Sequence, residues 1–227
     1  MADDAILTIR KGFPRPATDI VAAFRGALSG HVVDAQGRRG AIDHTIRPLV
    51  IGGPFAGTAL TVLSAPRDNL APYAALQVAR PGDVLVIATG DYQGAAVVGD
   101  LLVGMAKNCG VIAVVTDGVV RDIAGLEEVG LPIFARGLTP NSPQKHGPGF
   151  IGFEVSLGGE VIRSGDVVVG DRDGLVVVPR EQARATLAGL EAVRAKERQM
   201  EAAVRDGAKA PSWLAGVLAG PGVSFVD

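Results

Sequence analysis

Three short apolar runs alternate with two segments of helical character between residues 84 and 136, and this alternation limits the possible folds more than any other feature. The runs lie at 84–88, 111–116 and 131–136. Continuous runs rich in β-branched residues are typical of strands that are covered on both faces. Gly110 and Gly130 are placed to end the two helices between them. This order predicts right-handed βαβ units with locally parallel strands.

Asp100 and the pair Arg121–Asp122 begin the two helices of this prediction, since each follows a strand. The carboxyl ends of parallel strands share one edge of the sheet, where open α/β sheets bind ligands. Twenty residues separate Asp100 from Arg121, the length of one helix plus one strand. We therefore expect these charged side chains to meet across one crevice.

The rest of the chain is expected to add helices and hairpins. Helices are predicted at 17–28, capped by Thr18 or Asp19, at 68–79 and, as one long helix, at about 180–205. Two β-like runs lie at 47–66, and hairpins with Gly-rich turns at 152–179. RSGDVVVG in the second region echoes RPGDVLVI in the sheet, but two copies are not a repeat architecture. We predict an α/β sandwich of sheets with helices outside, in a single domain over residues 1–227.

Composition excludes several classes of protein. A net charge of −2 provides no global basic field that would attract nucleic acid or anionic membranes. The single cysteine, Cys109, cannot form an intrachain disulfide, and its apolar neighbours indicate a core position. No uninterrupted apolar run approaches the ~20 residues that span a bilayer, and the acidic start lacks the features of a signal peptide. A cytoplasmic protein is expected.

Common catalytic motifs are missing from the sequence. It contains no GxSxG, Walker A or GxGxxG pattern, so serine-hydrolase, P-loop and dinucleotide-binding functions lack support. The histidines His31, His44 and His146 are isolated and do not have metal-ligand spacing. Lys145 lies in an exposed Pro/Gly loop, a setting that does not favour a Schiff-base lysine.

The residues at the predicted crevice suit a metal-assisted reaction on an acidic substrate. Asp100 and Asp122 could each simply cap a helix, but Arg121 opposes the helix dipole and therefore needs an anionic neighbour or ligand. Asp122 could hold Mg²⁺ or Mn²⁺, which prefer oxygen ligands, and Arg121 could bind a substrate oxygen or carboxylate. Free backbone N–H groups around residues 99–102 would form an anion site. Asp100 could act as a base, directly or through water.

The predicted C-terminal helix contains one anomaly. Leu190, Val193, Met200 and Val204 follow a three-and-four spacing along one face, and Glu197 lies in the middle of that stripe. Two interpretations remain open. The glutamate either lies at the margin of the stripe, or the face meets another subunit and brings Glu197 to a site there.

The spaced motif Asp100–x20–Arg121–Asp122 resembles that of the RraA-like family. The context GDLLVGMAKNCGVIAVVTDGVVRDIAGLEEVGLPIFARG and the later SGDVVVGDRDGLVVVP resemble it too, so that the likeness covers roughly residues 15–205. The family contains the class II 4-hydroxy-4-methyl-2-oxoglutarate and 4-carboxy-4-hydroxy-2-oxoadipate aldolases of aromatic-compound catabolism. It also contains the regulator of ribonuclease activity A.

The resemblance implies an α-β-β-α sandwich protomer in a trimer or a hexamer of two trimers. It implies a divalent metal at Asp122, a water-mediated acid–base role for Asp100, and a glutamate from a neighbouring subunit, for which Glu197 is the candidate by position. It also implies that the substrate is bound by Arg121 and by Gly99, Asp100, Leu101 and Leu102.

The activity implied is metal-dependent retro-aldol cleavage of a 4-hydroxy-2-oxo acid, with release of pyruvate. Because oxaloacetate gives the same enolate on losing CO₂, decarboxylation is expected as a second activity. Two alternatives remain: a regulator that binds a ribonuclease E-type enzyme without turnover, and a lyase of the same chemistry acting on another 2-oxo acid.

Overall fold

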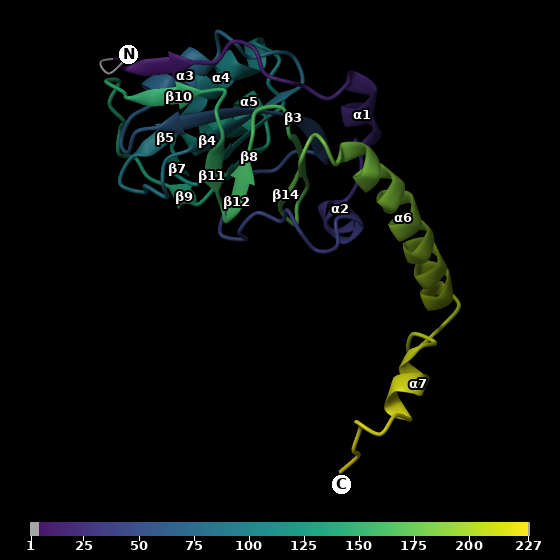
Figure 1. Ribbon diagram of the computed structural model, residues 1–227. Coiled ribbons are helices and arrows are strands. Elements are labelled where there is room, and N and C mark those ends of the chain that lie inside the picture. Colours follow the sequence, from purple (N-terminus) through teal and green to yellow (C-terminus); the bar gives the residue numbers. More distant parts are fainter. Residues whose placement is uncertain (1–4, 227) are drawn as a thin grey trace.

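The computed structural model describes residues 5–226, which form a layered α/β body from which one long helix projects (Figure 1). The helices are α1 (Thr18–Ala23), α2 (Ser29–Ala35), α3 (Leu70–Ala75), α4 (Asp100–Asn108), α5 (Ile123–Val129), α6 (Ala183–Arg205) and α7 (Leu214–Leu218). The strands are β1 (Leu7–Ile9), β2 (Arg47–Val50), β3 (Phe55–Ser64), β4 (Asp83–Ala88), β5 (Ala96–Val98), β6 (Ala113–Thr116), β7 (Val119–Val120), β8 (Ile133–Ala135), β9 (Gly137–Leu138), β10 (Gly149–Ile151), β11 (Val155–Leu157), β12 (Glu160–Ile162), β13 (Val167–Gly170) and β14 (Leu175–Val178).

The parallel part of a nine-stranded sheet forms the centre of the body. In it β3, β4, β6 and β8 are neighbours, and each pair runs parallel. The predicted succession of strand, helix, strand, helix, strand is thereby confirmed in β4, α4, β6, α5 and β8. Strand β6 begins two residues later than predicted, at Ala113, because the Val111 N–H still bonds the Ala106 carbonyl at the end of α4.

Side chains of the central sheet enter two separate cores. Leu85 of β4 packs with Leu102 of α4 and Leu126 of α5, so helices α3, α4 and α5 cover one face of the sheet. Val84 and Val86, which point to the opposite face, pack against the hairpins β11–β12 and β13–β14. These hairpins, predicted from the Gly-rich turns of residues 152–179, form the second β layer, and β13 also pairs antiparallel with β3, so that the β13–β14 hairpin is continuous with the nine-stranded sheet.

A third core lies between the second β layer and the outer helices. Val168 of β13 faces the central sheet, whereas Val167 and Val169 pack with Phe24 and with Leu190 of α6. The alternation of side chains along one strand thus separates two cores. The order of layers is helices α3–α5, central sheet, hairpins, helices α1, α2 and α6, which is the expected α-β-β-α sandwich with a long C-terminal helix.

Helix α6 leaves the body after its first turns. Leu190 is buried against α2, whereas Met200 and Val204 further along the same stripe are exposed, and α7 lies beyond them at the far end of the chain (Figure 1). The predicted long helix is confirmed, with its start at Ala183. None of the helices in the described part of the chain is both long and apolar enough to cross a membrane.

The two similar stretches of sequence form the same turn. The Asp83 carboxylate accepts the Arg80 N–H at 2.9 Å, and the Asp166 carboxylate accepts the Arg163 N–H at 2.9 Å. Asp166 accepts a second backbone N–H, from Arg180, at 3.0 Å. Burial nevertheless raises the pKa of Asp166 above its usual value, because desolvation outweighs these two hydrogen bonds.

Three local predictions are wrong. Ala17 occupies the cap position of α1, so neither Thr18 nor Asp19 caps it. The helix expected at 17–28 ends early, because Gly26 adopts a left-handed conformation, and an unpredicted α2 follows. Cys109 is half-buried rather than in the core, since it caps the exposed C-terminal end of α4.

A second parallel sheet of three short strands was not predicted either. Its order is β5–β7–β9, and β5 and β7 lead directly into α4 and α5. The residues at the starts of these helices therefore follow the small sheet, not the central one.

Candidate active site

The small sheet brings the starts of α4 and α5 together. Strands β5 and β7 run parallel with Val98 opposite Val120, and the Arg121 N–H donates to the Val98 carbonyl at 3.1 Å. The backbone leaves β5 and β7 at the same edge of the small sheet, so Gly99–Asp100 and Arg121–Asp122 become neighbours. The expected meeting of these charges thus occurs at the edge of the small sheet.

Two glycines allow the close approach of the acidic side chains. A Cβ atom at Gly99 would lie 2.5 Å from Asp122 Oδ2, and a Cβ atom at Gly125 would lie 2.4 Å from Asp100 Oδ2. Gly99 has an ordinary extended backbone, so space and not conformation excludes a side chain there. Because neither glycine has a side chain, each carboxylate can lie against the backbone of the neighbouring helix.

Asp122 does not act as a helix cap. It occupies the N-cap position of α5 in a left-handed conformation (φ +61°), but its side chain makes no capping hydrogen bond. The carboxylate, 42% exposed, instead forms an ion pair in which its Oδ2 lies 3.1 Å from Arg121 Nε. The interpretation of Asp122 as a simple cap is therefore wrong, and its remaining oxygen lone pairs are available for a ligand.

Arg121 has the anionic neighbour that its position required. Its guanidinium is held at two points, by Nε to Asp122 and by Nη1, which donates to Ser142 Oγ at 2.7 Å. The third nitrogen, Nη2, has no acceptor within residues 5–226. A planar cation fixed in this way presents one free donor nitrogen for an anionic ligand.

The start of α4 offers fewer free N–H groups than predicted. Asp100 is its first residue, after Gly99 at the cap position, and its Oδ1 accepts the Leu101 N–H at 2.7 Å. Leu101 therefore does not contribute a free donor. The N–H groups of Asp100 and Leu102 find no acceptor in the described part of the chain, so the expected anion site keeps these two donors.

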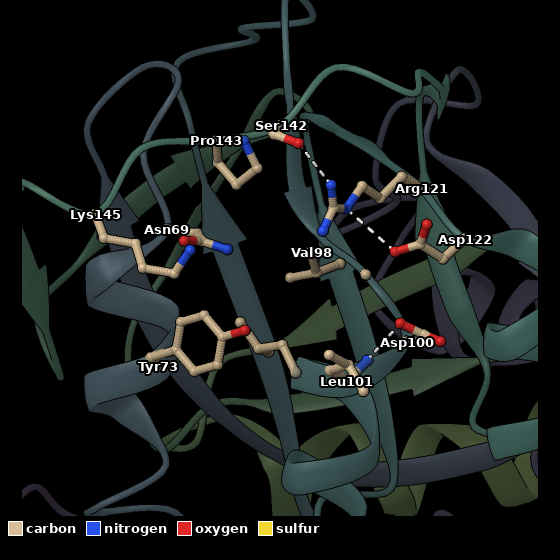
Figure 2. A pocket seen from close by; sticks show the side chains of 12 residues that line it. Asn69, Tyr73, Val98, Asp100, Leu101, Arg121, Asp122, Ser142, Pro143 and Lys145 are labelled. Carbon is tan, nitrogen blue, oxygen red and sulfur yellow. Dashed lines mark hydrogen bonds and ion pairs between the residues drawn. The ribbon is translucent and has the colours of Figure 1, made fainter.

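These groups line one wall of a cavity of about 110 Å³ that is open to solvent. Figure 2 shows Arg121, Asp122 and Asp100 on one side of it and Asn69, Tyr73 and Lys145 on the other. The lining residues are Asn69, Tyr73, Val98, Gly99, Asp100, Leu101, Leu102, Arg121, Asp122, Ser142, Pro143 and Lys145. A cavity of this size fits a small organic acid rather than a nucleotide.

The second wall was missed at the sequence level. Asn69 and Tyr73 belong to the start of α3, and Ser142, Pro143 and Lys145 to a loop that belongs to no regular element. None of these residues is part of a recognisable spaced motif. Lys145 is exposed, as expected, but it reaches the cavity and lies 5.9 Å from the centre of the Tyr73 ring.

Glu197 is not among the residues lining this cavity. It lies on α6 beside α2, where its Oε2 is 3.9 Å from His31 Nε2 of the same chain. The described residues therefore place every predicted site residue except Glu197 at one cavity.

The protein donors suit an open metal site. No group of three or more His, Cys, Asp or Glu side chains within residues 5–226 is arranged to hold a metal ion. Asp122, whose carboxylate is paired with Arg121, lines a cavity that can also admit water and substrate oxygens. Mg²⁺ is commonly held by one or two carboxylates and completes its coordination with water and substrate, so these residues fit it.

Fold and site together define an α-β-β-α protein with an Asp–Arg cavity at the ends of short parallel strands. The family model RraA-like, described as Aldolase/RraA, matches residues 26–177. The chain belongs to the RraA-like family.

Three of the relatives carry two kinds of name. A protein of Halalkalibacterium halodurans, named provisionally as a 4-hydroxy-4-methyl-2-oxoglutarate aldolase, is 39% identical over 189 residues, which cover 83% of this chain and 90% of that one. RraAS2 of Streptomyces coelicolor, from the RNase ES inhibitor family, superposes with a TM-score of 0.72 at 29% identity, over 84% of this chain and all of that one. The RNA-processing inhibitor RraA of Thermus thermophilus gives 0.63 at 27%, over 67% of this chain and 93% of that one.

Proposed function

We propose that the chain catalyses the divalent-metal-dependent retro-aldol cleavage of a 4-hydroxy-2-oxo di- or tricarboxylic acid, with release of pyruvate. The substrate class includes 4-hydroxy-4-methyl-2-oxoglutarate and 4-carboxy-4-hydroxy-2-oxoadipate, and oxaloacetate decarboxylation is a second activity. The observation that carries the proposal is the cavity in which the Arg121–Asp122 pair faces Lys145. The aldolase name of the relative from Halalkalibacterium halodurans supports it.

Arg121 and the start of α4 bind the 2-oxo acid end of the substrate in this proposal. The free N–H groups of Asp100 and Leu102 and the Nη2 of Arg121 are donors on one wall. When the C3–C4 bond breaks, its electron pair passes to the C2 oxygen as an enolate. A donor fixed before the reaction stabilises this developing charge most effectively.

Asp122 holds the metal ion in this proposal. A bound Mg²⁺ or Mn²⁺ supplies a Lewis acid that polarises the 2-oxo group. Asp122 is suited to hold it because its carboxylate makes no capping bond and is kept in place by the ion pair with Arg121.

Asp100 moves protons in this proposal, through a water molecule. The proton of the 4-hydroxyl leaves as its O–H electrons form the new C4 carbonyl, and C3 of the enolate later takes up a proton to give pyruvate. Asp100 is half-buried beside Gly125, and its Oδ1 is occupied by the Leu101 N–H, which leaves Oδ2 as the basic atom.

The wall opposite Arg121 supports a substrate that carries a second acidic group. The Lys145 ammonium is the cation of this wall, and the distal end of a di- or tricarboxylic acid bound to Arg121 would face it (Figure 2). A monocarboxylic 2-oxo acid would leave that cation without a partner.

Glu197 belongs to the site of a neighbouring protomer in this proposal. It lies on α6 about one turn before Met200 and Val204, which are exposed in this chain. We therefore expect residues 1–227 to act as a single domain in a trimer or hexamer, with the helix at about 180–205 at a subunit boundary. There Glu197 would approach the water molecules around the metal.

The second candidate function is regulation of a ribonuclease E-type enzyme without turnover. The names of the Streptomyces coelicolor and Thermus thermophilus neighbours favour it. The two candidates are separated by an activity that only the aldolase has.

The test is a pyruvate-release assay with the two hydroxy-oxo acids and oxaloacetate. Mg²⁺ or Mn²⁺ should support turnover, EDTA should abolish it, and either metal should restore it. Full activity in metal-stripped protein would contradict the metal assignment. No pyruvate from any of the three acids, together with inhibition of a ribonuclease E-type enzyme, would replace the aldolase by the regulator.

A further inference from the structure

A second cavity lies where β4 begins. It has a volume of about 220 Å³, is open to solvent, and shares no lining residue with the cavity at Arg121. Gly82, directly before β4, lines it, and so does Thr58 of β3, which pairs with Asp83 in the register of the two parallel strands. Tyr73 of the candidate active site instead follows the end of β3. The two cavities are therefore separate sites towards opposite ends of this strand pair.

Three arginines line the second cavity, and one of them already has an acidic partner. Arg15 binds the buried Asp83 carboxylate through both Nη1 and Nη2. The side chains of Arg25 and Arg80 make no hydrogen bond or ion pair in the described part of the chain, whose acidic residues are also missing from the cavity lining. Two uncompensated positive charges thus line one cavity of a protein whose net charge is −2. Such a local field attracts an anion.

Thr58 adds an uncharged donor to the same cavity. The residue is only 8% exposed, and its hydroxyl forms no hydrogen bond with any residue from 5 to 226. Because this oxygen is not enclosed by protein, a ligand in the cavity can reach it. The Thr58 N–H donates to the Gly82 carbonyl at 3.2 Å, which fixes the residue in the wall. Buried polar groups usually have a partner, so an unpaired hydroxyl on a fixed strand indicates a ligand or water there.

The cavity also offers apolar contacts. Pro16, Val21, Ala56 and Pro81 belong to its lining. An inorganic ion gains nothing from these groups, whereas the carbon chain of an organic acid loses its contact with water when it lies against them. The lining therefore favours an organic anion.

The two free guanidinium groups define how many acidic groups the ligand carries. Arg25 follows α1 and Arg80 precedes β4, so the two cations come from separate elements. A guanidinium fork matches one carboxylate at two points, as the pair of Arg15 and Asp83 shows in this same cavity. We propose that this cavity binds a small aliphatic dicarboxylic acid, with one carboxylate on Arg25, the other on Arg80, and a hydrogen bond from the Thr58 hydroxyl. The site is additional to the aldolase site and does not depend on the proposed function.

Titration calorimetry of the full chain with glutarate tests the site. Glutarate has two carboxylates on a short carbon chain but no 2-oxo group, and EDTA in the buffer keeps metal away from Asp122. The parent should bind glutarate saturably, and Arg121→Ala should bind it within about twofold of the parent because the two cavities are separate. Butyrate, with one carboxylate, and inorganic phosphate, without a carbon chain, should each bind about 10-fold more weakly or worse.

Three variants assign the ligand to this cavity. Arg25→Ala and Arg80→Ala should each weaken glutarate binding about 10- to 100-fold, because a charged pair is lost. Thr58→Val keeps the shape without the hydroxyl and should weaken it about 2- to 10-fold. Arg198→Ala, at an exposed arginine further along α6, is the control matched in charge and should bind like the parent. Thermal unfolding without glutarate should stay close to that of the parent, since neither Arg25 nor Arg80 has a side-chain partner to lose.

Absence of saturable binding to the parent, or parental affinity in both Arg25→Ala and Arg80→Ala, would overturn the proposal. Phosphate binding as tight as that of glutarate would overturn the choice of a dicarboxylic acid. Loss of glutarate binding in Arg121→Ala would overturn it as well, because the acid would then occupy the candidate active site.

Discussion

A methyl group added at Gly125 would test the placement of Asp100 without removing a charged group. Its Cβ would lie 2.4 Å from Asp100 Oδ2 and 2.7 Å from Asp100 Cβ, whereas ordinary contact begins at 3.4 Å. The carboxylate must therefore shift by about 1 Å, and rotation of the side chain alone cannot relieve the clash because Cβ is also too close. A misplacement of about 1 Å can cost on the order of 10²-fold in rate. We expect Gly125→Ala to lower kcat for pyruvate release about 100-fold.

The same change should lower the free energy of unfolding by at most about 2.5 kcal/mol. Ala is favoured over Gly inside a helix by roughly 0.5–1 kcal/mol, which offsets part of the roughly 1–3 kcal/mol that overpacking costs. Gly104→Ala in α4 is the matched control, because the nearest atom to its added Cβ is Val129 Cγ2 at an ordinary 3.8 Å. Steady-state pyruvate release and thermal unfolding of both variants provide the measurement. If Gly125→Ala retains the kcat of the parent, the position of Asp100 is not part of the chemistry.

Three further predictions concern Arg121, Glu197 and Asp166. Arg121→Ala should lower kcat on the order of 10²-fold or more without a matching loss of stability. Arg121→Lys should restore little activity, because a point charge cannot replace two fixed guanidinium contacts. Turnover by both variants at the parent's rate would show that Arg121 has only a structural role. Arg121→Ala and Glu197→Gln oligomers should each be impaired, and co-refolding them should return some activity through mixed interfaces, whereas full activity of Glu197→Gln or of a stable monomer would refute the shared site. Burial raises the pKa of Asp166 above the usual 3.8, so the stability it contributes is present below that pH and is lost as pH rises through the higher folded-state value. In denaturant unfolding, the advantage of the parent over Asp166→Asn should therefore shrink from acidic pH towards neutrality; a difference independent of pH would show that the carboxyl titrates normally.

The central sheet could be predicted because its signals are local. The β-branched runs at 84–88 and 111–116 contain no charged residue and only one polar residue, Thr116, so only burial on both faces suits them. Gly110 and Gly130 both have positive φ, so each end of helix was marked by the one residue that adopts this conformation freely. Because the strands are parallel and joined by right-handed connections, Asp100, Arg121 and Asp122 could be predicted to lie at one edge of a sheet.

The second wall of the cavity could not be predicted, because it depends on contacts between distant segments. Residues 67–69 meet residues 144–146 through backbone hydrogen bonds, which any sequence can form and no side-chain pattern marks. Asn69 looks like an ordinary helix cap until the bond from Asp68 to the Leu70 N–H shows that the cap is provided elsewhere.

The two walls therefore have different physical origins, and this difference separates the groups for the chemical step from the groups that recognise the rest of the substrate. Arg121 and Asp122 are fixed by the strands that precede them and by Gly99, where any side chain would displace the Asp122 carboxylate. Lys145 is exposed and lies in a loop outside the regular elements, so a change there would leave the small sheet and the Arg121–Asp122 pair in place. Groups that the chemistry needs at fixed distances thus lie on the rigid wall, and groups that read the remainder of the substrate lie on the wall that can vary. It follows that exchange of residues 143–145, with Ser142 and its bond to Arg121 kept, should change which acid is cleaved before it changes whether the C–C bond can be broken.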